Sequence, residues 1–181
     1  LGSVSPIGND VETTWNNAIN GVSGAGPITH FDSSQFKTQF ACEVKDYDPS
    51  IYLARKEIRK CDRYTLLAIG SSEEAIADSK LDCANEDCDR IGVIMAAGIG
   101  GIRTFEEEGT YYATHEDMGP KFNPFFIPKM ISDIASGLIS IRHGLRGPNY
   151  GTVSACASST HSAISAFDHI RLGKADVMIV G

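Results

Sequence analysis

The pattern of apolar and polar positions is clearest in the last part of the chain, where it predicts a strand, a helix and a second strand. The strands are expected over residues 150–155 and 175–181, and the helix over residues 157–172. One side of this helix carries Ala163, Ile164, Phe167 and Ile170. Arg171 in the last turn and Gly173 just after it are favoured at a helix C-terminus. The three segments predict a right-handed βαβ unit.

The first part of the chain predicts a helix, a loop and a short strand. Asn9 is a candidate N-cap, with Glu12 as its partner in a capping box. Apolar residues then recur at helical spacing, at Val11, Trp15, Ala18 and Ile19. Glycines over residues 21–26 open a loop, and the alternation of Phe40, Cys42 and Val44 predicts a half-buried strand.

The middle of the chain alternates helical and strand patterns. Helices are expected over residues 53–60, 62–79 and 131–141, and a buried strand over residues 91–97. Glycine and three prolines make residues 110–128 mostly irregular by expectation. Alternating elements of this kind predict an α/β fold with buried, mainly parallel strands.

Composition and charge narrow the class of protein. The 181 residues are 42% hydrophobic and 22% charged, which is typical of a globular domain. Sixteen basic and 23 acidic residues give a net charge of −7, which argues against nucleic-acid binding. No apolar run approaches the roughly 18 residues of a membrane span, and no leader is visible. A start without Met and an end inside an apolar run favour a piece of a larger protein.

Cysteine usage argues against a metal centre or a disulfide framework. The five cysteines are scattered, and no pair has the C-x-x-C spacing. This pattern favours the reducing cytoplasm, and no metal or cofactor is expected.

Cys156 is the leading candidate for chemistry because it lies where the predicted strand 150–155 meets the following helix. The N–H groups and partial positive charge at a helix N-terminus favour the thiolate, which is the nucleophilic form. The same N–H groups can hold an oxyanion. The alternative is a buried structural cysteine, which is common.

Two further features are weaker candidates for a functional role. His161 lies about 140° around the helix from Cys156, so a structural role is favoured over that of a base. The glycine-rich residues 98–101 follow a strand but lack the spacing of a nucleotide-binding turn. Glycines there would instead let the backbone approach a ligand or another segment, with Ile99 projecting beyond the strand.

A basic cluster stands out in this acidic chain. Lys56, Arg59 and Lys60 share one face if the segment is helical, and such a face can dock an acidic partner. The alternative is a solvated helix face on which Glu57 and Asp62 offset part of the charge.

Several motifs in order resemble the β-ketoacyl-acyl-carrier-protein synthases. Residues 149–181, NYGTVSACASSTHSAISAFDHIRLGKADVMIVG, resemble the active-site segment of that family. The supporting motifs are LGSVSPIG at 1–8, RKEIRK at 55–60, GIGG at 98–101, NPFFIP at 123–128 and GLRGP at 144–148. The resemblance covers essentially the whole chain and is greatest to the elongating synthases, type II in particular.

The resemblance implies a layered αβαβα fold of the thiolase-like kind, of which this chain supplies most of the N-terminal half and is incomplete at both ends. It also implies a homodimer and a decarboxylating Claisen condensation in fatty-acid synthesis, with acyl- and malonyl-loaded acyl-carrier protein as partner. Cys156 would be the nucleophile, and Ile99, Phe125 and Phe126 would line the acyl tunnel. Lys56, Arg59 and Lys60 would form the carrier-docking patch.

The family's two catalytic histidines, its active-site lysine and its gating loop fall in the half that follows these residues. The alternative function is therefore an acyl- or carrier-binding fragment without turnover. A non-catalytic chain-length subunit of a polyketide synthase would typically lack the cysteine. A thiolase or a type III synthase has a different nucleophile segment, and no C-G-S-C-W pattern of a papain-like protease surrounds Cys156.

Overall fold

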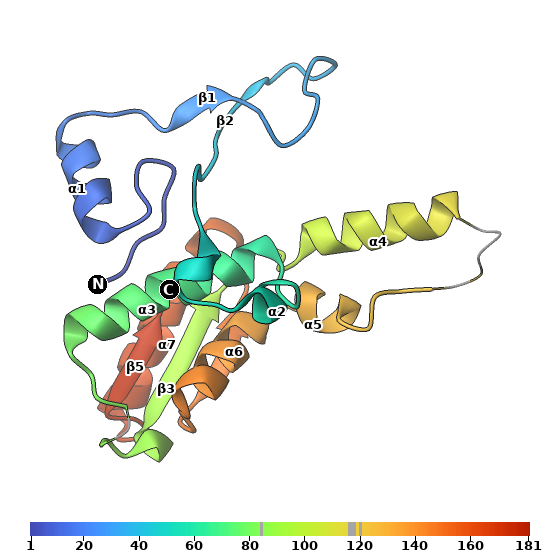
Figure 1. Cartoon of the computed structure of the whole chain (residues 1–181). Coiled ribbons are helices and arrows are strands. Elements are labelled where there is room, and N and C mark those ends of the chain that lie inside the picture. The colour runs from blue at the N-terminus through green and yellow to red at the C-terminus, as the bar shows by residue number, and fades with distance from the viewer. Residues whose placement is uncertain (84, 116–118, 120) are drawn as a thin grey trace. The chain divides into compact units, whose positions relative to one another are not determined.

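The computed structural model describes residues 1–83, 85–115, 119 and 121–181, and these form two compact units (Figure 1). The first unit comprises Leu1–Ile51 and Gly70–Leu81, and the second comprises Tyr52–Ile69 and Asp82–Gly181. Helix α3 (Arg63–Ser79) contributes residues to both.

The first unit contains one helix and a two-stranded antiparallel sheet. Its elements are α1 (Val11–Ile19), β1 (Ala25–Pro27), β2 (Phe40–Cys42) and the 3-10 helix η1 (Pro49–Ile51). The N-cap predicted at Asn9 is wrong by one residue. Asp10 caps α1, accepting a 2.6 Å hydrogen bond from the Thr13 N–H, while Asn9 donates to the Lys45 carbonyl.

The short strand predicted around Phe40 forms, but its burial is opposite to the expectation. Phe40 and Cys42 are exposed, and the buried residue is Glu43, which directly follows β2. The Glu43 carboxylate accepts hydrogen bonds from the N–H and the hydroxyl of Thr29 at 3.0 and 2.7 Å. A polar contact therefore holds the two arms of this sheet together, where the pattern had indicated apolar packing.

The second unit is built on a three-stranded parallel sheet in the order β4-β3-β5. The strands are β4 (Asn149–Thr152), β3 (Ile91–Ala96) and β5 (Val177–Val180). The central strand β3 is buried over its first five residues, which confirms the predicted buried parallel strand. The least exposed side chains include Ile91, Val93 and Ile94 of this strand and Ile139 of the helix α6 (Ile134–His143).

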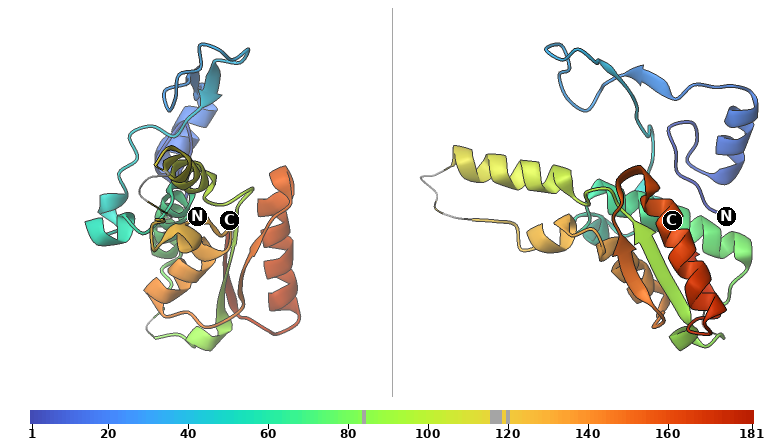
Figure 2. Two further views of the ribbon diagram at one scale, coloured as in Figure 1. Left: turned by 90° about the vertical axis from the view of Figure 1, so that its right-hand side faces the viewer. Right: turned by 180° about the vertical axis from the view of Figure 1, so that it is seen from behind.

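Helices cover both faces of this sheet. Helix α7 (Ser158–Arg171) packs on one face and α6 on the other, as the turned view in Figure 2 shows. The remaining elements of the unit are α2 (Arg55–Ile58), η2 (Cys88–Arg90), α4 (Ile102–Thr114), α5 (Phe126–Met130) and η4 (Ala155–Ala157). The βαβ arrangement predicted for the end of the chain is present as β4, α7 and β5, with β3 between the two strands.

Two predictions for the helices need correction. Only residues 55–58 of the helix expected over 53–60 are helical. The expectation that residue 110 begins an irregular stretch is also wrong, because α4 continues to Thr114. On this helix an Arg103–Glu107 ion pair, one turn apart, adds to helix stability. Residues 116–118 and 120 of that stretch lie outside the described part.

Helix α7 packs on the sheet through small residues rather than through its large apolar ones. Ser158, Ser162 and Ala166 are buried, whereas Ile164, Phe167 and Ile170 are exposed. The Ser162 hydroxyl is satisfied by Thr152 Oγ1 at 2.7 Å, so burying it leaves no unpaired polar group. Small side chains allow the helix to lie close to β3 and β4, which places its first turn near the end of β4.

Candidate active site

Two of the segments singled out in the sequence leave the same edge of the parallel sheet. Ala96 at the end of β3 pairs in register with Thr152 at the end of β4. The glycine-rich residues 98–101 follow β3, and Cys156 follows β4. In α/β sheets the carboxyl edge of the strands is the usual place for a ligand. The topology thus brings the nucleophile candidate and the Ile99 loop to one edge.

Cys156 is presented by a short, strained turn. Ala155 has a φ of 49°, in the left-handed region that residues with a Cβ rarely adopt. Ser158 braces the turn, because its Oγ accepts from the Ser154 N–H and donates to the Ala155 carbonyl, both at 2.7 Å. The prediction that Cys156 lies at a strand-to-helix junction is confirmed, since η4 lies between β4 and α7.

The surroundings of Cys156 suit a nucleophile. Its side chain is exposed, and its backbone N–H donates to no residue in the part of the chain that the structure describes. The N–H lies in η4, the turn that leads into α7, and the positive end of the α7 dipole with its unpaired donors is adjacent. A thioester carbonyl approaching the sulfur could therefore place its developing oxyanion against this donor.

The other cysteines lack this setting, although none of the five forms a disulfide. Cys61 is half-buried, and burial is the main cause that raises the pKa of its thiol and so disfavours the thiolate. The Cys88 Sγ donates to the Cys83 carbonyl at 2.9 Å. Cys42 is exposed but lies on β2. The strained turn and the helix start distinguish Cys156.

His161 serves the same turn. Its Nδ1 lies 2.6 Å from Ser154 Oγ, two residues before the cysteine. This hydrogen bond fits the structural role favoured from its position on the helix. His169, on the same helix, bonds the Tyr150 hydroxyl through Nε2 at 3.1 Å.

Ile99, which is itself 68% exposed, lies at an open apolar hollow of about 470 Å³, called the Ile99 cavity below. The cavity is lined by Ile99, Ile102, Phe105, Met130, Ile131 and Ser132. The glycines around Ile99 allow a close backbone approach: the Gly101 N–H donates to the Met130 carbonyl at 2.9 Å, and a Cβ at Gly101 would lie 2.2 Å from the Lys129 carbonyl oxygen. The loop is therefore fixed against the end of α5.

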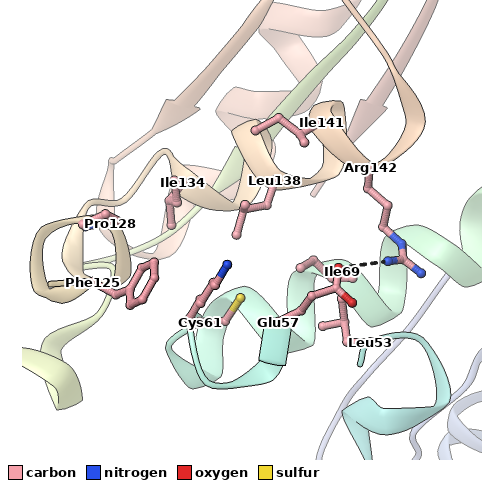
Figure 3. A pocket seen from close by; sticks show the side chains of 11 residues that line it. Leu53, Glu57, Cys61, Ile69, Phe125, Pro128, Ile134, Leu138, Ile141 and Arg142 are labelled. Atoms are coloured by element: carbon pink, nitrogen blue, oxygen red, sulfur yellow. Dashed lines mark ion pairs between the residues drawn. The ribbon is translucent and has the colours of Figure 1, made fainter. Parts of the chain in front are cut away.

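The two adjacent phenylalanines of the NPFFIP motif have different surroundings. The Phe126 ring stacks with Phe105, which lines the Ile99 cavity, at 6.4 Å between centroids. Phe125 instead lines a second cavity of about 490 Å³, drawn in Figure 3. Ile102 and Phe105 are further lining residues that the sequence expectations do not include, and the amphipathic pattern of α4 is the signal that indicates them.

The basic patch is exposed and is not neutralised by its acidic neighbours. Lys56, Arg59 and Lys60 are all exposed, and no ion pair joins them to an acidic residue within the described ranges. Glu57 accepts from the Ala54 N–H and pairs with Arg142 at 3.8 Å (Figure 3).

Asp62, the other acidic residue expected to offset the patch, is buried and bonded to Thr104. The positive charge of the patch is therefore available to an acidic partner.

Neither a metal site nor a membrane-crossing helix is found in the part of the molecule described. No group of three or more His, Cys, Asp or Glu side chains there is arranged to hold a metal ion. No helix there is both long and apolar enough to cross a membrane.

Comparison with known proteins gives a consistent result. All residues 1–181 match the family model for the β-ketoacyl synthase N-terminal domain. A 3-oxoacyl-[acyl-carrier-protein] synthase 2 of Staphylococcus aureus is 43% identical over 182 residues, covering all of this chain and 43% of that protein. The chain therefore spans less than half the length of this curated relative.

Solved structures share the fold. A ketosynthase with its chain length factor, from the ishigamide system, matches with a TM-score of 0.89 at 23% identity, over 99% of this chain and 45% of that one. A type II polyketide ketosynthase in complex with its acyl-carrier protein matches with a TM-score of 0.83 at 22% identity, over 99% and 47%. These similarities show that the α/β fold is that of the thiolase-like ketosynthases, of which these residues cover under half.

Proposed function

Because the chain belongs to the β-ketoacyl synthase family and matches that family's N-terminal domain, we propose that it forms part of an enzyme that extends acyl chains by condensation. In this enzyme the chain would supply the half that carries the nucleophile. The 181 residues would supply the N-terminal half of the thiolase-like fold in a longer synthase, which agrees with the 43% share of the relative that they cover. The pathway would be fatty-acid elongation, as the name of that relative suggests.

The proposed chemistry begins at Cys156. Its thiolate attacks the carbonyl carbon of an acyl thioester, the carrier thiol leaves, and an acyl-cysteine forms. Malonyl-carrier protein then loses CO₂, and the carbanion that remains attacks the acyl-cysteine carbonyl. A new carbon–carbon bond forms, the 3-oxoacyl chain stays on the carrier, and the Cys156 thiolate is released. The backbone N–H of Cys156 would stabilise the oxyanion formed in each attack on the acyl carbonyl.

The strained turn at Cys156 is the single observation that carries this proposal. An exposed thiol, an unpaired N–H and a helix start come together at the carboxyl edge of a parallel sheet. Catalytic nucleophiles are held in sharp strand-to-helix turns of this kind in other enzymes. The groups that polarise the malonyl thioester would come from the half of the family fold beyond these residues.

The proposed partner is an acyl-carrier protein, loaded first with the acyl chain and then with malonyl. Support comes from the exposed basic patch, in a chain that is otherwise acidic, and from the related ketosynthase that was solved with its acyl-carrier protein. We further propose a homodimer in the cytoplasm; five cysteines that form no disulfide suit a reducing compartment.

The test uses the full-length protein that contains these residues, with malonyl-carrier protein labelled in its free carboxyl group. Release of labelled CO₂ that requires an acyl-carrier substrate, together with a 3-oxoacyl product, is the expected result. Acylation of the protein without CO₂ release would support the alternative, an acyl- and carrier-binding protein without turnover. Neither acylation nor release would contradict both functions.

Replacement of Ile99 with phenylalanine should shift the accepted chain length toward shorter acyl groups. The larger side chain would fill part of the Ile99 cavity and leave the end of a long chain unburied. The kcat/KM for the longest substrate should fall about tenfold, as expected for roughly two unburied methylene groups at about 0.8 kcal/mol each. Short substrates should react at the wild-type rate. The measurement is kcat/KM across a series of acyl-carrier substrates.

The matched control is Ile19→Phe, the same change at another exposed isoleucine, on α1. It should leave the chain-length profile unchanged. An Ile99→Phe enzyme with the wild-type profile would show that Ile99 does not face the acyl chain.

A further inference from the structure

Asp62 is a buried carboxylate that caps two helices at once. The residue is only 7% exposed and lies in the chain between α2 and α3. One oxygen, Oδ2, accepts from the hydroxyl and the N–H of Thr104 at 2.6 and 3.1 Å, and Thr104 is in the first turn of α4. The other oxygen, Oδ1, accepts from the Tyr64 N–H in the first turn of α3. A negative charge at two helix N-termini is stabilising, and its hydrogen bonds are stronger than neutral ones.

Asp62 joins the start of α3 to the start of α4. Each of these helices follows a segment to which the proposed function gives a role in substrate binding. The basic patch, Lys56, Arg59 and Lys60, ends two residues before Asp62. The Ile99 loop ends at Gly101, which is the N-cap of α4. Asp62 therefore connects the end of the patch segment to the first turn of α4, and α4 begins where the loop that lines the cavity ends.

Further contacts make this a continuous cluster. The Lys60 ammonium lies 5.3 Å from the centroid of the Phe125 ring, just before α5. The Tyr64 hydroxyl donates to the Ile131 carbonyl, and Ile131 lines the Ile99 cavity. These contacts connect the patch, the starts of α3 and α4, and the end of α5.

We propose that Asp62 is a positioning residue that couples docking of the carrier protein to the shape of the acyl cavity at Ile99. The inference rests on the proposed function, because it takes the basic patch as the docking surface and the cavity as the acyl site. Docking would shift the segment that ends at Asp62, and the buried hydrogen bonds to Thr104 would move the start of α4 with it. Coupling of this kind is a free energy shared between two sites, so it acts only when the carrier is bound.

The experiment compares Asp62→Asn, Thr104→Val and Thr104→Ser in the full-length protein. Asparagine keeps the shape of Asp62, but its amide nitrogen must face one of the N–H or O–H donors. Valine at 104 removes the hydroxyl, and serine restores it. Each enzyme is given a long and a short acyl chain, once on the carrier protein and once on a small pantetheine thioester.

The expected result is a loss that depends on the carrier. Asp62→Asn and Thr104→Val should lower kcat for the long chain on the carrier about tenfold, with the KM for the carrier within about twofold of wild type. The same variants should react with pantetheine thioesters as wild type does, and Thr104→Ser should retain wild-type rates on both.

Two results would overturn the coupling alone. One is an equal loss on the carrier and on pantetheine at both chain lengths, accompanied by a lower melting temperature, which is the result of a merely structural role. The other is no loss in any variant. An inactive wild-type protein would overturn the proposed function and this inference together, so the two failures are distinguishable.

Discussion

Replacing Cys156 with alanine should abolish acyl-enzyme formation by the full-length protein. The sulfur is the atom that bonds the acyl carbon, and no other cysteine has both the strained turn and the helix start beside it. Loss of a catalytic nucleophile typically costs a factor on the order of 10⁶ in rate. The measurement is the single-turnover release of free carrier thiol from an acyl-carrier substrate, which should fall to the background of hydrolysis.

Cys61→Ala is the matched control for this variant. Cys61 is half-buried, and burial raises the pKa of its thiol, so its removal should leave the release rate unchanged. Carrier thiol released at the wild-type rate by Cys156→Ala would show that the acyl group is bound elsewhere.

Reversing the charge of the docking patch should weaken the reaction with carrier-bound substrates. The double change Lys56→Glu and Arg59→Glu leaves Lys60 and its contact with Phe125 intact. The kcat/KM for acyl-carrier protein should fall about 10- to 100-fold at low salt, because electrostatic steering changes association rates by such factors. The loss should shrink as salt is added, since screening weakens attraction between exposed charges.

The control for this prediction is Lys37→Glu with Lys174→Glu, which changes the net charge equally at two other exposed residues. Rates with a small pantetheine thioester should be the same in both variants. If the control loses as much activity as the patch variant, net charge rather than the patch is responsible. A loss that persists at high salt would likewise contradict electrostatic docking.

The parts of this fold that could be predicted from the sequence are those encoded by neighbouring residues. The buried strand β3 is a continuous apolar run, and the end of α7 is indicated by Arg171 and Gly173. Cys156 could be placed at a strand-to-helix junction because both flanking elements have clear patterns. These signals are local, so they do not depend on tertiary contacts.

The parts that could not be predicted depend on competition or on distant contacts. Asn9 and Asp10 are both good N-caps, and only the folded backbone decides between them. The charge of the basic patch could not be judged either, because the partner of Asp62 is Thr104, 42 residues away. The adjacent rings of Phe125 and Phe126 line different surroundings, which no pattern of apolar residues distinguishes.

We expect Cys156 to be the residue that accepts the acyl chain. The most direct measurement is the mass of each cysteine-containing peptide after the full-length wild-type protein is incubated with an acyl-carrier thioester and digested. One acyl group per chain is expected, on the peptide that contains Cys156, with unmodified peptides for the other four cysteines. An acyl group on a different residue, or no acyl group on any peptide, would contradict it.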